Sequence, residues 1–145
     1  MLPNNRKVAE AVYLSILLCV CGCIGLIQVI QMAPNGNLPI RVLSVKVEVR
    51  HRQELFDQLQ KFAEKHDFRI SIREVQVVPD GIFIQMNRSD LEIDSSSYAS
   101  DPTLLDFAIH DRDLDHPTPK DIVDDLFNDL RKFISEVPNV VITEE

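Results

Sequence analysis

The densest group of side chains that could do chemistry lies in residues 110–116, which read HDRDLDH. Its three aspartates alternate with other residues, as the first ligands of a calcium loop do, and they are Asp111, Asp113 and Asp115. The pattern then fails, because His116 stands where that loop needs glycine and Ile122 where it needs a bidentate glutamate. We therefore predict no EF-hand. The weaker alternative is a looser divalent-cation site, serving a small enzyme or a cation sensor, in residues 101–116.

The sequence contains no complete catalytic set. Asp106 and His110 lie on one face of a predicted strand, but four residues at about 3.3 Å each separate them by roughly 13 Å, too far for a dyad. Residues 95–97 are serines without nucleophile-elbow spacing. His110 and His116 lack a third ligand in register, so they do not predict a zinc site. We predict a non-enzymatic protein with no cofactor and no evident small-molecule substrate.

Charge is the second chemical signal. The chain has 15 Lys+Arg and 23 Asp+Glu, a net charge of −8, which opposes binding to nucleic acid phosphates. The charge is unevenly distributed: residues 41–88 hold 9 basic and 7 acidic side chains, whereas residues 89–145 hold 4 and 15. The second half of the chain is therefore where an electrostatic partner site is expected.

The aspartates of that half predict one negative surface, formed by the 111–115 segment and by the face of the second predicted helix that lies away from its apolar stripe. They are Asp111, Asp113, Asp115, Asp121, Asp124, Asp125 and Asp129. The simpler interpretation is a solvated surface that aids solubility. The functional interpretation is a docking site for a basic protein, because complementary fields raise the association rate.

Basic side chains of the first half could flank an open face or edge of the sheet, and they are Lys46, Arg50, Arg52, Arg69 and Arg73. Because Glu48 and Glu74 are interspersed among them, an ordinary salt-bridged surface is the simpler interpretation. An exposed strand edge could also pair with an extended segment of a partner, but the sequence does not indicate which strand lies at the edge.

An apolar segment near the N-terminus predicts a membrane anchor. Residues 11–30 read AVYLSILLCVCGCIGLIQVI, in which Gln28 is the strongly polar member. A helix of this length spans roughly 30 Å, the thickness of the hydrocarbon core. Arg6 and Lys7 precede it, so the positive-inside tendency places the N-terminus in the cytoplasm. We expect a cytoplasmic segment (1–10), a transmembrane anchor (11–32), a linker (33–40) and an extracytoplasmic or periplasmic domain (41–145).

A lipid anchor is the alternative. Val20-Cys21-Gly22-Cys23 resembles the bacterial lipoprotein box, which implies that Cys23 is acylated after removal of the preceding residues. The chain stays apolar after Cys23, where lipoproteins turn polar. The three cysteines all lie in this segment, so we expect the exported domain to have no disulfide and no thiolate metal site.

Hydrophobic periodicity predicts the elements of the domain. Alternation of apolar and polar residues indicates strands, spacings of three and four indicate helices, and Pro79-Asp80-Gly81 indicates a hairpin turn. The expected strands are 41–50, 68–78, 82–86, 104–110 and 140–142, and the expected helices are 53–66 and 119–137. Thr118 is the expected N-cap of the second helix, and residues 95–103 are expected to form a loop.

The predicted order is β-α-β-β-β-α-β, with a weaker alternation over 90–94 as the candidate for one more strand. Two helices on one face of a mostly antiparallel sheet make an α+β, two-layer sandwich. The order resembles the ferredoxin-like split β-α-β arrangement with an extra strand. This likeness is architectural and implies no specific activity.

Overall fold

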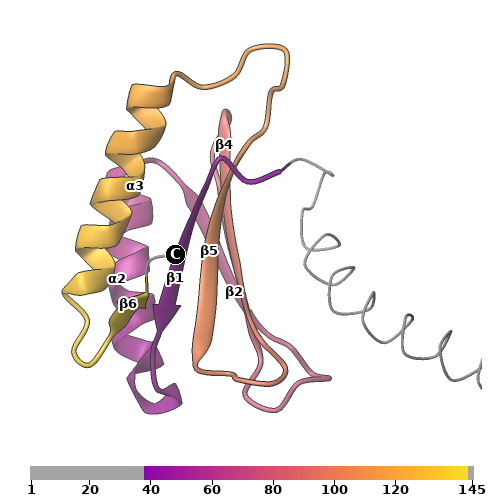
Figure 1. The fold of residues 1–145 in the computed structure, drawn as a ribbon, viewed down its shortest axis with the longest axis vertical. Coiled ribbons are helices and arrows are strands. Elements are labelled where there is room, and N and C mark those ends of the chain that lie inside the picture. The colour runs from indigo at the N-terminus through magenta and orange to yellow at the C-terminus, as the bar shows by residue number, and fades with distance from the viewer. Residues whose placement is uncertain (1–37, 144–145) are drawn as a thin grey trace, which may run out of the picture. The chain divides into compact units, whose positions relative to one another are not determined.

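The domain is an antiparallel sheet covered on one face by two helices (Figure 1). The computed structural model describes residues 38–143. The strands are β1 (Arg41–Lys46), β2 (Arg69–Glu74), β3 (Ile82–Asn87), β4 (Leu91–Ser97), β5 (Leu104–Asp111) and β6 (Val141–Thr143). The helices are α2 (Arg52–Lys65) and α3 (Lys120–Ser135), and the 3-10 turn η1 (Val49–His51) precedes α2. The predicted α+β class is therefore confirmed.

The six strands lie in the order β2-β3-β4-β5-β1-β6, and every neighbouring pair is antiparallel. Helix α2 connects the inner strand β1 to the edge strand β2. Strands β2 to β5 then follow one another as a meander, and α3 connects β5 to β6 at the opposite edge. Four strands thus lie between the helices in sequence, one more than in the predicted order, because the weak alternation near 90–94 belongs to β4.

The core lies between the helices and one face of the sheet. Alternate residues of the strands point toward the helices, and among the fully buried ones are Phe107 on β5 and Ile84 on β3. The facing helical positions recur at spacings of three and four and are Leu55, Leu59, Phe62, Leu126, Leu130 and Ile134. Burial of each such side chain stabilises the fold by roughly 2 kcal/mol relative to exposure.

Two predicted boundaries, the end of the first strand and the start of the second helix, are wrong. The first strand ends at Lys46 rather than residue 50, because His51 donates its backbone N–H to the carbonyl of Glu48 and closes the η1 turn. Val49 lies in that turn and is 41% exposed. The second helix begins at Lys120, with Pro119 at its N-cap.

The polar stretch 95–97 is strand rather than loop. Ser95 and Ser97 occupy the helix-facing positions of β4, and the hydroxyl of Ser97 accepts a hydrogen bond from the backbone N–H of Ile82 at 2.9 Å.

The hairpin at Gly81 is also wider than expected. Strand β2 ends at Glu74, and the turn closes where Val75 donates its backbone N–H to the carbonyl of Gly81.

The predicted membrane segment and Cys23 lie outside the described residues. The chain divides into two units at Leu38–Pro39, and all the strands and helices above belong to the second unit. Within residues 38–143, neither helix combines the length and the apolar content needed to cross a bilayer.

Candidate functional site

The seven predicted aspartates fall into two groups, and three of them accept hydrogen bonds from a different segment of the chain. Asp111 accepts the backbone N–H of Thr118 at 2.9 Å, and the N-cap of α3 is Pro119 rather than the predicted Thr118. Asp124 accepts Nε of Arg41 at 3.0 Å. The carboxylate of Asp129 accepts hydrogen bonds from α2, as described below. These carboxylates hold α3, and the connector before it (residues 112–119), against the rest of the domain.

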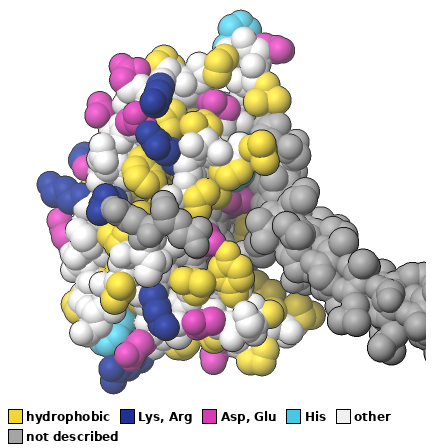
Figure 2. Space-filling model, viewed as in Figure 1, with side chains coloured by type: hydrophobic (Ala, Val, Ile, Leu, Met, Phe, Trp, Pro, Cys, Tyr) yellow, Lys and Arg dark blue, Asp and Glu magenta, His cyan; other side chains and the backbone are white. Residues whose placement is uncertain are grey.

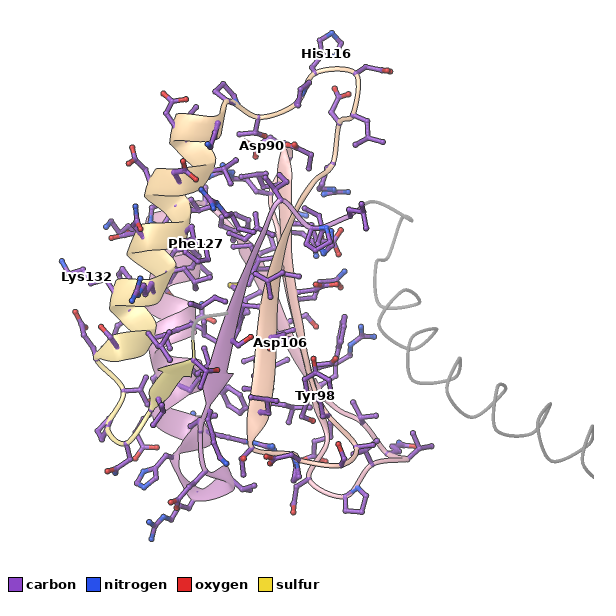
Figure 3. The ribbon with its side chains drawn as sticks, in the orientation of Figure 1. Asp90, Tyr98, Asp106, His116, Phe127 and Lys132 are labelled. Carbon is purple, nitrogen blue, oxygen red and sulfur yellow. The ribbon has the colours of Figure 1, made fainter. Side chains whose placement is uncertain are left out.

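The other four aspartates lie at the start of α3 and in the connector before it, and we call Asp113, Asp115, Asp121 and Asp125 the acidic end of α3. All four are exposed. Asp113 accepts the backbone N–H groups of Asp115 and His116, which shapes the connector carrying His116 (Figure 3). Among residues 38–143, Asp115, Asp121 and Asp125 make no ion pair.

The helical period places Asp121 and Asp125 together. The buried positions of α3 are Val123, Leu126, Leu130 and Ile134, so this stripe faces the sheet. Asp121 and Asp125 are four residues apart outside the stripe, where like charges repel by a few tenths of a kcal/mol. The helix dipole favours Asp121 in the first turn, but Asp125 is a turn further on. A cation bound between them would relieve this repulsion.

The surface over α3 is not uniformly negative. In Figure 2, Lys and Arg side chains (dark blue) lie between the acidic ones (magenta) on the side where Figure 1 places α3. The predicted negative surface of seven aspartates is therefore reduced to the acidic end of α3, and the remaining aspartates are balanced by neighbouring cations or N–H donors.

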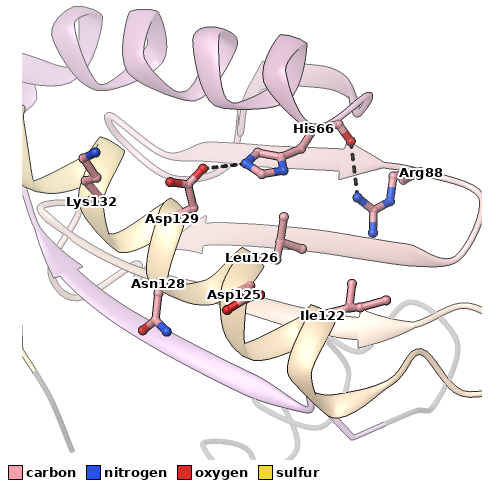
Figure 4. Close-up of a pocket in the computed structure, with 8 residues that line it drawn as sticks. All are labelled: His66, Arg88, Ile122, Asp125, Leu126, Asn128, Asp129 and Lys132. Atoms are coloured by element: carbon pink, nitrogen blue, oxygen red, sulfur yellow. Dashed lines mark hydrogen bonds and ion pairs between the residues drawn. The ribbon is translucent and has the colours of Figure 1, made fainter.

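A groove of about 540 Å³ lies beside the acidic end of α3 (Figure 4). Its lining comes from α3, from the end of α2 and from the β3–β4 turn, and consists of His66, Arg88, Ile122, Asp125, Leu126, Asn128, Asp129 and Lys132. Ile122 is 46% exposed although it is apolar, whereas Leu126 is buried. The groove therefore offers an apolar contact directly beside the Asp125 carboxylate.

Asp129 lines the groove, and residues at the end of α2 hold its carboxylate in place. Its Oδ2 lies 2.5 Å from Nζ of Lys65 and 2.6 Å from Nε2 of His66. These hydrogen bonds lower the pKa of Asp129, and the bond from Lys65 has the largest effect. The imidazole packs on Phe62, with ring centroids 4.7 Å apart. Sequence reasoning missed this pair because 63 residues separate His66 from Asp129.

Arg88 is also held in place. It donates Nε and Nη2 to the two carboxylate oxygens of Asp90, at 2.6 and 2.9 Å, and lies 4.8 Å from the ring centroid of Phe68. The hydrogen bonds from Arg88 are the largest cause lowering the pKa of Asp90. Because the charges of Arg88 and Asp129 are satisfied, Asp125 and Lys132 are the groove charges that make no ion pair within the described residues.

The groove offers contacts for non-covalent binding. An imidazole oriented by a carboxylate could accept a proton, but none of the lining residues is Ser, Thr or Cys, and so none supplies a hydroxyl or thiol nucleophile. The Asp125 carboxylate beside the exposed side chain of Ile122 is suited to a polypeptide segment that has a basic residue beside an apolar one.

The connector aspartates serve the backbone in the described part of the chain. Asp111 and Asp113 accept backbone N–H groups. In residues 38–143, no group of three or more His, Cys, Asp or Glu side chains is arranged to hold a metal ion. His116 contacts Asp113 through Nδ1 at 3.2 Å and is exposed, while His110 lies on β5, so the two histidines occupy different parts of the structure.

Asp106 and His110 have separate partners on the face of the sheet opposite the helices. Asp106 accepts the hydroxyl of Tyr98 (Figure 3), and Nε2 of His110 lies 3.4 Å from Oδ1 of Asp94. His110, Asp94 and Glu92 are buried, and Glu92 accepts Nε2 of Gln85 at 2.7 Å. Sequence reasoning missed this buried polar row. The signal that could have found it is the alternation of Glu92 and Asp94 with apolar neighbours on β4.

The predicted basic group is dispersed. Arg50 pairs with Glu48 at 2.6 Å, and Lys46 lies 3.8 Å from Asp101. Arg52 is buried at the start of α2. Arg69 and Arg73 are exposed on the edge strand β2.

Comparison with protein-family models and with curated proteins finds no match to this chain.

Proposed function

We propose that this protein is a membrane-tethered, extracytoplasmic, non-enzymatic interaction module that docks a basic partner at the acidic end of α3. An immunity-type or inhibitor protein and an accessory subunit of an envelope complex are both instances of this class. The observation that carries the proposal is the exposed Asp121–Asp125 pair, which makes no ion pair within residues 38–143 and lies beside the exposed apolar side chain of Ile122.

The contacts support a binding role for these positions in particular. Asp124 and Asp129 lie on the same helix, and each makes ion pairs inside the domain. Asp121 and Asp125 make none within the described residues and gain stabilising charge contacts only when a cation approaches. A partner segment with an arginine or lysine at Asp125 and an aliphatic side chain on Ile122 would use both properties of the groove.

Quantitative co-purification tests this proposal. The full-length chain, extracted from its native membrane in mild detergent, is compared with Asp121→Asn/Asp125→Asn. We expect a basic protein to be enriched with the wild type, to be lost with the variant, and to be lost as salt increases. The matched control is Asp57→Asn/Glu64→Gln, which removes two exposed acidic groups of α2 and should retain the partner. Equal recovery with all three chains would contradict the proposal.

The location has its own test. A phosphatase fused after Gly36 should be active if the domain is exported, and inactive if it stays in the cytoplasm. Mass spectrometry of the membrane-extracted protein distinguishes the two anchors, because an acylated Cys23 would be the first residue of a shortened chain, whereas a transmembrane anchor keeps residues 1–22.

The finer likeness to a ferredoxin-like order belongs to the same proposal. It is supported by the position of β1 between β5 and β6, with α2 and α3 as the two crossover helices. Strands β3 and β4 then form a hairpin added to that pattern. The likeness concerns architecture and carries no activity.

A further inference from the structure

The two edges of the sheet differ in what they offer to a partner. The edge strand β6 has three residues, whereas β2 has six, Arg69–Glu74, of which five are exposed. An edge strand presents unpaired N–H and C=O groups on its outer side. Strand β2 is therefore long enough to hydrogen-bond a partner segment of ordinary strand length.

The side chains of β2 divide between the two faces of the sheet. Ile70 and Ile72 lie opposite the buried Met86 and Ile84 of β3, so they continue the helix-covered face. Ile72 is nevertheless 36% exposed, because no strand lies beyond it. The opposite face of β2 carries Arg69, Ser71 and Arg73, all exposed. An added strand would meet isoleucines on one face, with Glu74 at the end of the strand, and arginines on the other.

The charges of Arg69 and Arg73 are available to a partner strand. Within residues 38–143 neither Arg69 nor Arg73 makes an ion pair, and the guanidinium of Arg73 lies 5.0 Å from the ring centroid of Phe83, which holds it over the sheet. Opposite charges on directly facing residues stabilise an antiparallel pair, and like charges destabilise it.

A second copy of the chain fits this edge poorly in the register that pairs both isoleucines with those of the other copy. The two-fold antiparallel register that pairs Ile70 with Ile72 of another copy also places Arg69 directly opposite Arg73 of that copy, and symmetry repeats the clash. The same arrangement of apolar and basic faces suits a heterologous strand that has acidic residues on one face.

We propose that β2 accepts an extended segment of another protein as an added antiparallel strand, and that this segment alternates acidic residues, facing Arg69 and Arg73, with apolar residues, facing Ile70 and Ile72. The binding mode is β-augmentation. It uses the edge of the sheet and residues distinct from the acidic end of α3, so either proposal can fail alone.

The probe is a synthetic peptide of about eight residues in which glutamate alternates with valine, a length typical of one strand. We expect it to bind the full-length chain and to slow amide hydrogen exchange in β2. Arg69→Glu/Arg73→Glu should weaken binding by about tenfold or more, from two reversed cross-strand charge contacts. Arg69→Gln/Arg73→Gln, which retains side-chain length and polarity, should weaken it by a smaller factor.

Matched controls separate strand pairing from general electrostatics. Lys61→Glu/Lys120→Glu makes the same change of charge at exposed positions on the two helices and should leave peptide affinity within about twofold. The Asp121→Asn/Asp125→Asn variant should also bind the peptide as the wild type does. A peptide N-methylated at alternate residues keeps its charge, loses strand hydrogen bonds and should not bind.

Several results would overturn the proposal. They are absence of binding by the glutamate–valine peptide, equal binding of the N-methylated peptide, or tighter binding of a lysine–valine peptide. Self-association of the chain that is changed by Arg69→Glu/Arg73→Glu would assign the edge to a second copy instead.

Discussion

The two helices of this domain begin in opposite ways. Helix α2 begins at Arg52, which is only 6% exposed and donates to the carbonyls of Asp80 in the β2–β3 turn and Pro102 in the β4–β5 turn. Helix α3 begins at the acidic end, where Asp121 and Asp125 are exposed and make no ion pair within residues 38–143. Both helices carry charge in their first turns, but only α2 uses it to join parts of the fold.

The difference separates charges that stabilise from charges that can bind. Burial lowers the pKa of Arg52, and the charge of Asp80 partly offsets this effect. This guanidinium is buried and donates to two backbone carbonyls, so it is poorly placed to bind a ligand. Asp121 and Asp125 at the start of α3 make no ion pair within residues 38–143, so we expect them to contribute little to folding and their charge to be available to a partner. Substitutions at the two sites should therefore have opposite consequences for stability and for binding.

The largest effect is expected at Arg52. Arg52→Met retains the apolar stem but leaves the carbonyls of Asp80 and Pro102 without these hydrogen bonds, which should lower the free energy of unfolding by about 3 kcal/mol. Urea denaturation followed by circular dichroism measures it. Arg50→Met, at a neighbouring exposed arginine, should cost under about 0.5 kcal/mol. Equal costs at the two positions would remove the contrast between the helices.

Asp129 should give an intermediate effect that depends on pH. Asp129→Asn removes a carboxylate that accepts from Lys65 and His66, and should cost about 1 kcal/mol at pH 7. Because folding lowers the pKa of Asp129 from its ordinary value of 3.8, its contribution is complete well above that pH and is lost as the pH falls through the folded value.

Denaturation at a series of pH values measures the Asp129 effect, with Asp121→Asn as the matched control from the same helix. The difference between wild type and Asp129→Asn should shrink below about pH 4. A difference that stays constant down to pH 2 would show that the carboxylate contributes through something other than its charge.

The acidic end of α3 should be nearly neutral for stability. Asp121→Asn/Asp125→Asn removes a like-charge contact and one favourable dipole contact, so the free energy of unfolding should change by less than about 0.5 kcal/mol. The same denaturation assay measures it. A loss above about 1 kcal/mol would place these aspartates among the structural charges and undermine their assignment to a partner.

The smallest effect is expected from divalent cations. Calorimetry of the full-length chain with calcium, magnesium and zinc should give no saturable binding at micromolar concentrations, because Asp111 and Asp113 already accept backbone N–H groups. Micromolar binding that disappears in Asp111→Asn/Asp113→Asn would favour the cation-dependent alternative and would give the connector a role beyond shaping the start of α3.

Local patterns were sufficient for much of the fold. The apolar stripe from Val123 to Ile134 predicted α3, and the alternation of Leu105, Phe107 and Ile109 predicted β5, because each pattern depends on near neighbours in sequence. Ser95 and Ser97 were misassigned, since a serine can occupy a buried strand position when a distant N–H, here that of Ile82, bonds its hydroxyl or packing covers it.

The site was less predictable than the fold. Spacing along α3 identified Asp121, Asp124, Asp125 and Asp129 as one surface, but it could not indicate that Arg41 and Lys65 hold two of them, since these partners are 83 and 64 residues away. Arg52 was predicted as part of a basic surface group, and its burial was missed for the same reason, because its acceptors are carbonyls of turns brought near by tertiary folding.

Site-specific photo-crosslinking in the native membrane tests the central claim most directly. A photoreactive residue replacing Asn128, which is exposed and lines the groove with Asp125, should form an adduct with a basic protein. One replacing Asp57 on α2 should not, and added salt should reduce the adduct at residue 128. Adducts of equal yield at both positions, or a salt-insensitive adduct with an acidic protein, would contradict docking at the start of α3.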